Sequence, residues 1–185
     1  MNDLLRVLLV EDNPGDAELM EEMLPRDGTT LFEVECVARL SEALECAGAD
    51  RFDIIILDLN LPDSDGLATL RTMRQQAFRM PIVVLTGNSD EQMALAAIQQ
   101  GAQDYLVKGQ IEKNMLVRSI KYAIERKQTE EALRASQQII EGILNAMPVR
   151  VFWKDRNLVY LGCNCLLYTS PSPRDSTSSR MPSSA

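Results

Sequence analysis

Residues 6–126 alternate short apolar runs with amphipathic stretches of helical spacing five times. Such an alternation predicts parallel strands joined by helices that cover both faces of one sheet. The uninterrupted run at residues 54–57 suits a central strand buried on both faces, whereas residues 32–37 alternate apolar and polar side chains and suit a strand nearer the edge. The sequence therefore predicts an α/β fold with a five-stranded, parallel, doubly wound sheet.

Four of the predicted strands end in polar residues of a complementary set. These are Glu11 and Asp12 after the first strand, Asp58 after the third, Thr86 after the fourth and Lys108 after the fifth. Open α/β sheets bind ligands beyond the carboxyl ends of their strands, so we expect these side chains to lie close together. The sequence predicts one site that combines three carboxylates, a hydroxyl and an ammonium.

This set of side chains suits phosphoryl chemistry. The three carboxylates would repel one another by several kcal/mol unless a cation lay between them. Mg²⁺ takes oxygen ligands and keeps positions for water or a phosphoryl group. Lys108 would add a positive charge and Thr86 a hydroxyl that can donate to a phosphoryl oxygen. A single Asp at a strand end is more often a turn or cap residue, so the prediction of an aspartyl-phosphate site depends on the joint occurrence of the set.

Composition excludes several other function classes. The chain contains no histidine, which excludes Ser-His-Asp and Cys-His catalysis within it. Its net charge of -8 predicts no nucleic-acid surface in this segment, because phosphate binding needs clustered Lys and Arg. The apolar runs are too short to span a bilayer and Met1 begins no signal peptide, so we expect a cytoplasmic protein without membrane contact. Cys36 and Cys46 are expected to be buried or half-buried.

A long helix is predicted after the fifth strand. Between about Glu112 and Ala146 the sequence has no proline and a single glycine, so a helix of roughly 50 Å can form at about 1.5 Å per residue. Two interpretations of residues 112–147 stay open: a solvated linker helix, or a parallel coiled coil that joins two copies of the chain. The second depends on a 4-3-4-3 spacing of Leu133, Gln137, Ile140, Leu144 and Met147.

The sequence changes character beyond this helix. Pro148 is expected to end it, and residues 149–161 predict a strand, a turn at Asp155-Arg156-Asn157 and a second strand. Residues 165–185 are predicted to be a disordered, non-native tail. Most of that tail is rich in serine and proline without apolar periodicity, and it resembles translated cloning-linker sequence.

Four segments resemble the motifs of response-regulator receiver domains. They are Leu9-Val10-Glu11-Asp12-Asn13, the run LDLNLPDSDG at residues 57–66, Leu85-Thr86-Gly87, and Asp104-Tyr105-Leu106-Val107-Lys108. The resemblance covers roughly residues 4–126, with the motifs in the family's order. It implies the flavodoxin-like strand order 2-1-3-4-5.

The resemblance also implies a function and a metal site. Asp58 would accept a phosphoryl group from the phosphohistidine of a histidine kinase or phosphotransfer protein, in a two-component phosphorelay. Mg²⁺ would be held by Asp12, Asp58 and the backbone carbonyl of Asn60, with Glu11 assisting through water. The domain would be no enzyme with turnover, because it assists only its own phosphorylation and dephosphorylation.

Further residues would bind the phosphoryl group or respond to it. The resemblance implies that Thr86 and Lys108 bind the phosphoryl oxygens. It also implies that Tyr105 turns inward when Thr86 moves toward the phosphoryl group. Asn60 and Asn88 would tune the rate at which water removes it.

Two positions depart from the commoner family pattern. Glu11 stands where Asp is commoner. Gly109 stands where many members have proline, which leaves open whether the Lys108–Gly109 bond is cis, since a non-proline cis bond costs about 2.5–4 kcal/mol.

Residues 128–164 resemble the entrance helix and the first two strands of a PAS sensor domain, with a simple hairpin as the alternative. The segments concerned include ILNAMP at residues 143–148 and VFWKD at residues 151–155. Together, the two resemblances imply a receiver domain at 1–126, a signalling helix at 127–147 and a truncated PAS-like start at 148–164, with an output module downstream.

Two other functions are alternatives for the acidic site. Aspartyl-nucleophile phosphatases use Asp-x-Asp, with the second carboxylate as general acid, and Asn60 at that position cannot donate a proton in this way. A receiver-like docking scaffold that needs no phosphorylation would have no use for the intact set of site residues.

Overall fold

The computed structural model describes residues 3–25, 30–48, 51–77, 79–87, 91–147 and 151–164. Strands and helices alternate along the chain: β1 Asp3–Val10, α1 Pro14–Met23, β2 Thr30–Val37, α2 Leu40–Ala47, β3 Ile54–Asp58, α3 Leu67–Gln76, β4 Ile82–Thr86, α4 Glu91–Gln99, β5 Asp104–Val107 and α5 Lys113–Ala146. Two short strands follow, β6 Phe152–Lys154 and β7 Tyr160–Cys163. The predicted five-fold alternation is confirmed.

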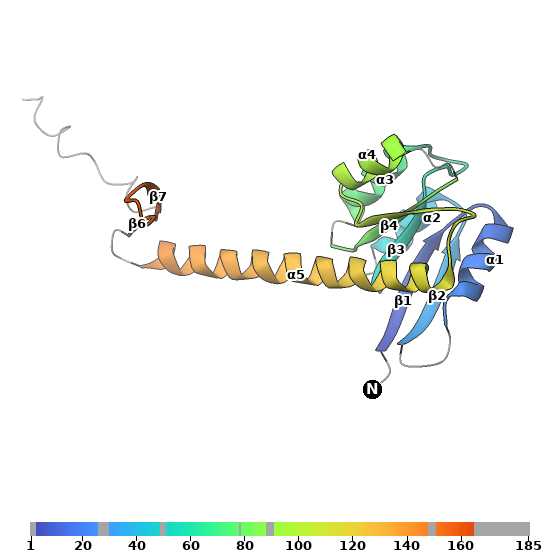
Figure 1. Cartoon of the computed structure of the whole chain (residues 1–185), viewed down its shortest axis with the longest axis horizontal. Helices are drawn as coiled ribbons and strands as arrows, with labels where there is room; N and C mark the ends of the chain where they lie inside the picture. Colours follow the sequence, from blue (N-terminus) through green and yellow to red (C-terminus); the bar gives the residue numbers. More distant parts are fainter. Residues whose placement is uncertain are drawn as a thin grey trace, which may run out of the picture. The chain divides into compact units, whose positions relative to one another are not determined.

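The first five strands form one parallel sheet in the order β2-β1-β3-β4-β5, with helices on both of its faces (Figure 1). The winding direction reverses between β1 and β3, because β2 lies on one side of β1 while β3, β4 and β5 follow on the other. This confirms the doubly wound, flavodoxin-like fold. Folds of this kind bind their ligands at the carboxyl ends of the strands on either side of such a reversal, here β1 and β3.

Two apolar layers pack the sheet against its helices, and β3 contributes to both. Its side chains from Ile54 to Leu57 are fully buried. Ile54 and Ile56 belong to the layer shared with α1 and α5, whereas Ile55 and Leu57 belong to the layer shared with α2, α3 and α4. Successive residues of a strand point to opposite faces, so a central strand covered on both sides needs a continuous apolar run.

The first helix begins at an asparagine cap. Asn13 Oδ1 accepts a hydrogen bond from the backbone N–H of Gly15 at 2.9 Å, and Pro14 occupies the first helical position. Ala17 and Met20 are buried on the inner face of α1. The cap thereby fixes the first turn of α1, which contains Asp16, directly after the end of β1.

The long helix is confirmed, with α5 running from Lys113 to Ala146. Leu116 and Ile120 in its first part are fully buried, whereas the side chains of residues 131–143 are exposed. None of the described helices is long and apolar enough to cross a membrane. Pro148 and residues 165–185 lie outside the described part of the chain.

The chain divides into two compact units, Met1–Glu130 and Glu131–Ala185. Within the second unit, β6 and β7 pair antiparallel, which confirms the predicted hairpin. Asp155 Oδ1 forms its turn by accepting hydrogen bonds from the backbone N–H groups of Asn157 at 2.9 Å and Val159 at 2.8 Å.

The prediction for one cysteine is wrong. Cys46 is half-buried as expected, but Cys36 is exposed, and both are free thiols. Phe32 and Val34, on the same face of β2 as Cys36, belong to the layer shared with α1 and α5. Cys36 lies near the end of this edge strand, where that layer no longer covers it.

Candidate functional site

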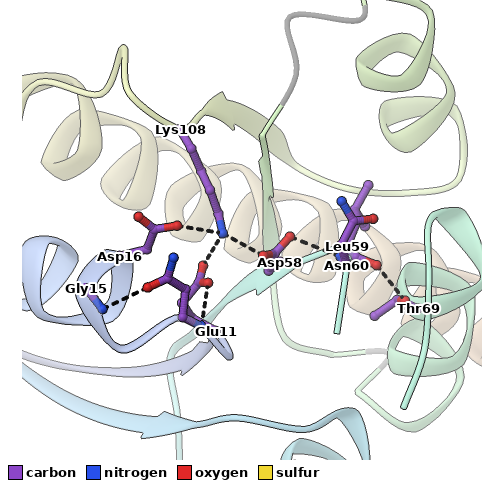
Figure 2. Close-up of polar contacts among 9 residues, drawn as sticks. Glu11, Gly15, Asp16, Asp58, Leu59, Asn60, Thr69 and Lys108 are labelled. Carbon is purple, nitrogen blue, oxygen red and sulfur yellow. Dashed lines mark hydrogen bonds and ion pairs between the residues drawn. The ribbon is translucent and has the colours of Figure 1, made fainter. Parts of the chain in front are cut away.

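The three predicted carboxylates lie together at the carboxyl edge of the sheet, where β1 and β3 end. Figure 2 shows two of them, Glu11 and Asp58. Glu11, Asp12 and Asp58 each offer an oxygen within 4.8 Å of the others. Glu11 is only 2% exposed and Asp58 only 4%, whereas Asp12 is open to solvent. The parallel sheet thus gathers into one cluster the side chains that its strand ends carry.

Lys108 points its ammonium into this cluster from the end of β5 (Figure 2). Its Nζ lies 2.6 Å from Glu11 Oε2 and 2.6 Å from Asp58 Oδ2, and the side chain is 16% exposed. Burial by itself lowers the pKa of Lys108, but hydrogen bonds to Asp58 and Glu11 and their negative charges outweigh it and raise the pKa above its ordinary value. Lys108 is therefore a fixed cation at neutral pH.

Glu11 is a buried carboxylate that the fold places beside another one. Its Oε1 accepts a hydrogen bond from the backbone N–H of Asn13 at 3.1 Å. Burial raises the pKa of Glu11, the hydrogen bonds from Lys108 and Asn13 oppose that rise, and the charge of Asp58 adds to it. Lys108 alone therefore does not fully compensate the negative charge at this position.

Asp58 begins a tightly held loop between β3 and α3. Its Oδ1 accepts a hydrogen bond from the backbone N–H of Asn60 at 3.0 Å, while its Oδ2 contacts Lys108. The buried hydroxyl of Thr69 donates to the Leu59 carbonyl at 3.0 Å and keeps this part of the loop against α3. Asn60 itself is exposed at the rim of the site.

Asp63 anchors the far end of the same loop, and no local signal in the sequence indicates it. Its carboxylate accepts hydrogen bonds from the backbone N–H groups of Leu40 at 2.9 Å and Ser41 at 3.0 Å. These N–H groups lie at the start of α2, whose own cap residue, Arg39, makes no capping hydrogen bond with its side chain. The hydrogen bonds, that from Ser41 above all, hold the pKa of Asp63 below its ordinary value.

The predicted switch residues lie on the two neighbouring strands β4 and β5. Thr86 is buried at the end of β4, and its carbonyl accepts a hydrogen bond from the Lys108 N–H at 2.8 Å. Tyr105 is half-buried and packs against the layer shared with α2, α3 and α4. The Lys108–Gly109 bond is trans, and Gly109 has a φ of 79°, which glycine adopts without strain. Asn88 lies outside the described residues.

Asp16 is a further member of the site that the strand-end pattern missed. From the first turn of α1, its Oδ2 lies 3.1 Å from Lys108 Nζ, and its side chain is 37% exposed (Figure 2). It is not part of the three-carboxylate cluster. The one available signal was the helix start at Asn13 and Pro14, which puts Asp16 in a first turn beside the end of β1.

The residues present fit a hard divalent cation. The carboxylates of Glu11, Asp16 and Asp58 contact the Lys108 ammonium, and Asp12 joins Glu11 and Asp58 in the cluster. Four carboxylates and one ammonium leave an excess of three negative charges when all are ionised. Two of the three clustered carboxylates are buried, so solvent screens their repulsion poorly. A cluster that offers only oxygen ligands suits Mg²⁺ far better than a soft metal.

Comparison with known proteins connects this site to a family. The model of the response regulator receiver domain matches residues 7–121. The cell cycle transcriptional regulator CtrA of Caulobacter vibrioides is 33% identical over 114 residues, which are 62% of this chain and 48% of CtrA. The KDP operon transcriptional regulatory protein KdpE of Escherichia coli is 39% identical over 105 residues, which are 57% of this chain and 45% of KdpE. The chain thus spans about half the length of the curated relatives it matches.

Solved structures agree with this match. A putative response regulator from Chloroflexus aurantiacus aligns with a TM-score of 0.59 and 31% identity, over 66% of this chain and 99% of its own. The receiver domain of a sensor histidine kinase from Pseudomonas aeruginosa, solved with a magnesium ion coordinated in its active site cleft, aligns with a TM-score of 0.56 and 33% identity, over 65% of this chain and 98% of its own. The family match over more than half of the chain, the strand order and the acidic edge of the sheet show that this chain belongs to the response regulator receiver family.

Proposed function

We propose that this domain is the phosphoacceptor of a two-component phosphorelay, and that Asp58 receives the phosphoryl group. The donor is the phosphohistidine of a histidine kinase or phosphotransfer protein. The observation that carries the proposal is the placement of Asp58: a nearly buried carboxylate with Oδ2 2.6 Å from the Lys108 ammonium, inside a cluster that fits a divalent cation. Residues 1–185 contain no histidine, so the donor residue lies outside them.

In the proposed transfer, an Asp58 oxygen attacks phosphorus and forms the O–P bond. The P–N bond to the donor imidazole breaks, its electron pair stays on the ring nitrogen, and that nitrogen takes up a proton from solvent. Asp12, Asp58 and the Asn60 carbonyl would hold Mg²⁺, with Glu11 acting through water. The bound ion would neutralise the negative charge of the carboxylates and of the incoming phosphoryl group. Lys108 and the Thr86 hydroxyl bind the phosphoryl oxygens.

The phosphoryl group then acts as a switch. It puts a charge of about -1.5 to -2 in place of a singly charged carboxylate, and this favours movement of Thr86 toward it. Tyr105, on the strand next to Thr86, turns inward with that movement. Asn60 and Asn88 tune the rate at which water removes the phosphoryl group.

Phosphorylation by a small-molecule donor tests this function. Incubation with an acyl phosphate or phosphoramidate and Mg²⁺ should raise the intact mass by one phosphoryl group, and EDTA should prevent the gain because the carboxylate cluster then keeps its excess charge. Hydroxylamine should remove the group, since the product is an acyl phosphate. No mass gain in the presence of Mg²⁺ would refute the proposal and leave the phosphorylation-independent docking scaffold. Steady release of phosphate from many substrate equivalents would instead favour a phosphatase.

We also propose that the receiver occupies residues 1–126, followed by a signalling helix at 127–147 and the start of a PAS-like domain at 148–164, with residues 165–185 non-native. The continuous helix α5 and the hairpin of β6 and β7 support this division. In this arrangement the phosphorylation state of Asp58 controls an output module downstream of the hairpin. Contact with nucleic acid is not part of the proposal for this segment, which has a net charge of -8.

The same helix supports a proposal of homodimers formed through residues 112–147. Leu133 is 62% and Ile140 is 55% exposed, although their spacing is that of a coiled-coil core. Pairing with a second copy would bury both side chains.

Dimer formation can be measured by sedimentation equilibrium. The chain should be dimeric at micromolar concentration, and the double substitution Leu133→Asp and Ile140→Asp should make it monomeric, because it puts charges in the core of the pair. Gln138→Asp, on another face of the helix, serves as the matched control and should stay dimeric. A monomeric wild-type chain would exclude the coiled coil and leave the solvated linker helix.

A further inference from the structure

The ammonium of Lys108 has three carboxylate partners that differ in kind. Glu11 and Asp58, each 2.6 Å away, belong to the cluster that fits a divalent cation. Asp16, 3.1 Å away, lies outside that cluster on α1. A bound cation would therefore compensate the negative charges of Glu11 and Asp58. The negative charge of Asp16 would be compensated by Lys108 alone.

The position of Asp16 is fixed by its helix. The Asn13 cap and Pro14 define the first turn of α1. The backbone at Asp16 is therefore already ordered, and the ion pair with Lys108 costs no backbone entropy there. The start of a helix also favours a negative charge, because its free N–H groups point toward that end. Asp16 thus presents its carboxylate to the Lys108 ammonium from a turn that the helix itself forms.

We propose that Asp16 is a positioning residue that holds Lys108 away from the incoming phosphoryl group and thereby slows phosphorylation of Asp58. This inference rests on the proposed function. Two physical effects act in the same direction. The Lys108 ammonium must exchange Asp16 for a phosphoryl oxygen, and the anionic donor must approach a site to which Asp16 adds a further negative charge.

The test compares four forms of the full chain: wild type, Asp16→Asn, Asp16→Glu and Glu18→Gln. Asp16→Asn removes the charge with little change of shape, and the partly exposed position should tolerate it. Asp16→Glu keeps a carboxylate within reach of Lys108. Glu18→Gln is the matched control, because it removes one exposed charge from the same helix, two residues further on.

Initial rates of phosphorylation by a phosphoramidate at saturating Mg²⁺ should rise about two- to fivefold in Asp16→Asn, the range expected for one partly exposed ion pair. Asp16→Glu should restore the wild-type rate, and Glu18→Gln should match the wild type. The Mg²⁺ concentration that gives half the maximal rate should be unchanged, because Asp16 lies outside the metal cluster. Part of the gain should persist in high salt, which screens long-range repulsion more than a direct contact.

Each other outcome decides against the inference. An unchanged or slower rate in Asp16→Asn would mean that Asp16 has no effect or orients Lys108 toward the phosphoryl group. An equal gain in Glu18→Gln would mean that the overall charge of α1 matters and the contact does not. If the wild-type chain takes up no phosphoryl group at all, the proposed function itself fails. If the wild type reacts, but at the same rate as Asp16→Asn, only the inference about Asp16 fails.

Discussion

Asp58→Asn should abolish the Mg²⁺-dependent gain of one phosphoryl group while the domain stays folded. An amide cannot replace the attacking carboxylate oxygen, so the O–P bond cannot form at this position. The amide oxygen can still accept the hydrogen bond that Asp58 Oδ1 takes from the Asn60 N–H. Intact-mass spectrometry after incubation with the donor measures the first expectation, and a cooperative thermal transition measures the second.

Asp65→Asn is the matched control for this substitution. Asp65 is an exposed carboxylate in the loop that Asp58 begins, and it is not part of the metal-fitting cluster. The control should therefore take up the phosphoryl group as the wild type does. A mass gain that survives in Asp58→Asn would place the phosphoryl group on another residue and contradict the proposed function.

The part of the site that lies at strand ends could be predicted because two local rules suffice for it. Continuous apolar runs identify buried parallel strands, and parallel strands bring their carboxyl ends to one edge. Glu11, Asp58 and Lys108 follow such runs directly, and the structure brings the Lys108 ammonium within hydrogen-bonding distance of both carboxylates. No knowledge of side-chain packing was needed for this group.

Contacts that depend on side-chain direction in loops and helices were not predictable in the same way. Asp16 meets Lys108 across 92 positions of sequence, and Asp63 caps a helix that begins 23 residues before it. In the second unit, Asn164 accepts a hydrogen bond from the Val151 N–H at 3.2 Å and donates one to the Leu144 carbonyl at 2.9 Å. Each of these polar residues also fits a solvated loop or helix surface, so only the packed chain distinguishes the two.

Lys108→Met should lower the free energy of unfolding of the metal-free domain by about 3 kcal/mol, the lower end of the range for breaking a buried ion pair. The lower end applies because Lys108 is 16% exposed. Methionine keeps much of the side-chain length but leaves Glu11 and Asp58 buried without their cation. Urea unfolding in EDTA measures the loss, and Lys121→Met, an exposed lysine of α5, should lose far less.

Added Mg²⁺ should recover most of the stability lost in Lys108→Met, because a cation that binds only the folded state stabilises it and replaces the missing positive charge.

The stability lost in Lys108→Met should also depend on pH. Burial raises the pKa of Glu11 above its ordinary 4.5, and the hydrogen bond from Lys108 opposes this rise, so the substitution raises that pKa further. Below its unfolded-state pKa, Glu11 is protonated in both states and its burial costs no charge. As the pH rises through its raised folded-state pKa, Glu11 ionises inside the site and the domain loses stability. The deficit of Lys108→Met should therefore be largest at neutral pH and shrink as the pH falls toward and below the ordinary value of 4.5, where Glu11 becomes protonated in the folded and unfolded chain alike. A deficit that is independent of both pH and Mg²⁺ would show that Lys108 stabilises the domain by packing alone, and not by compensating the charge of the acidic cluster.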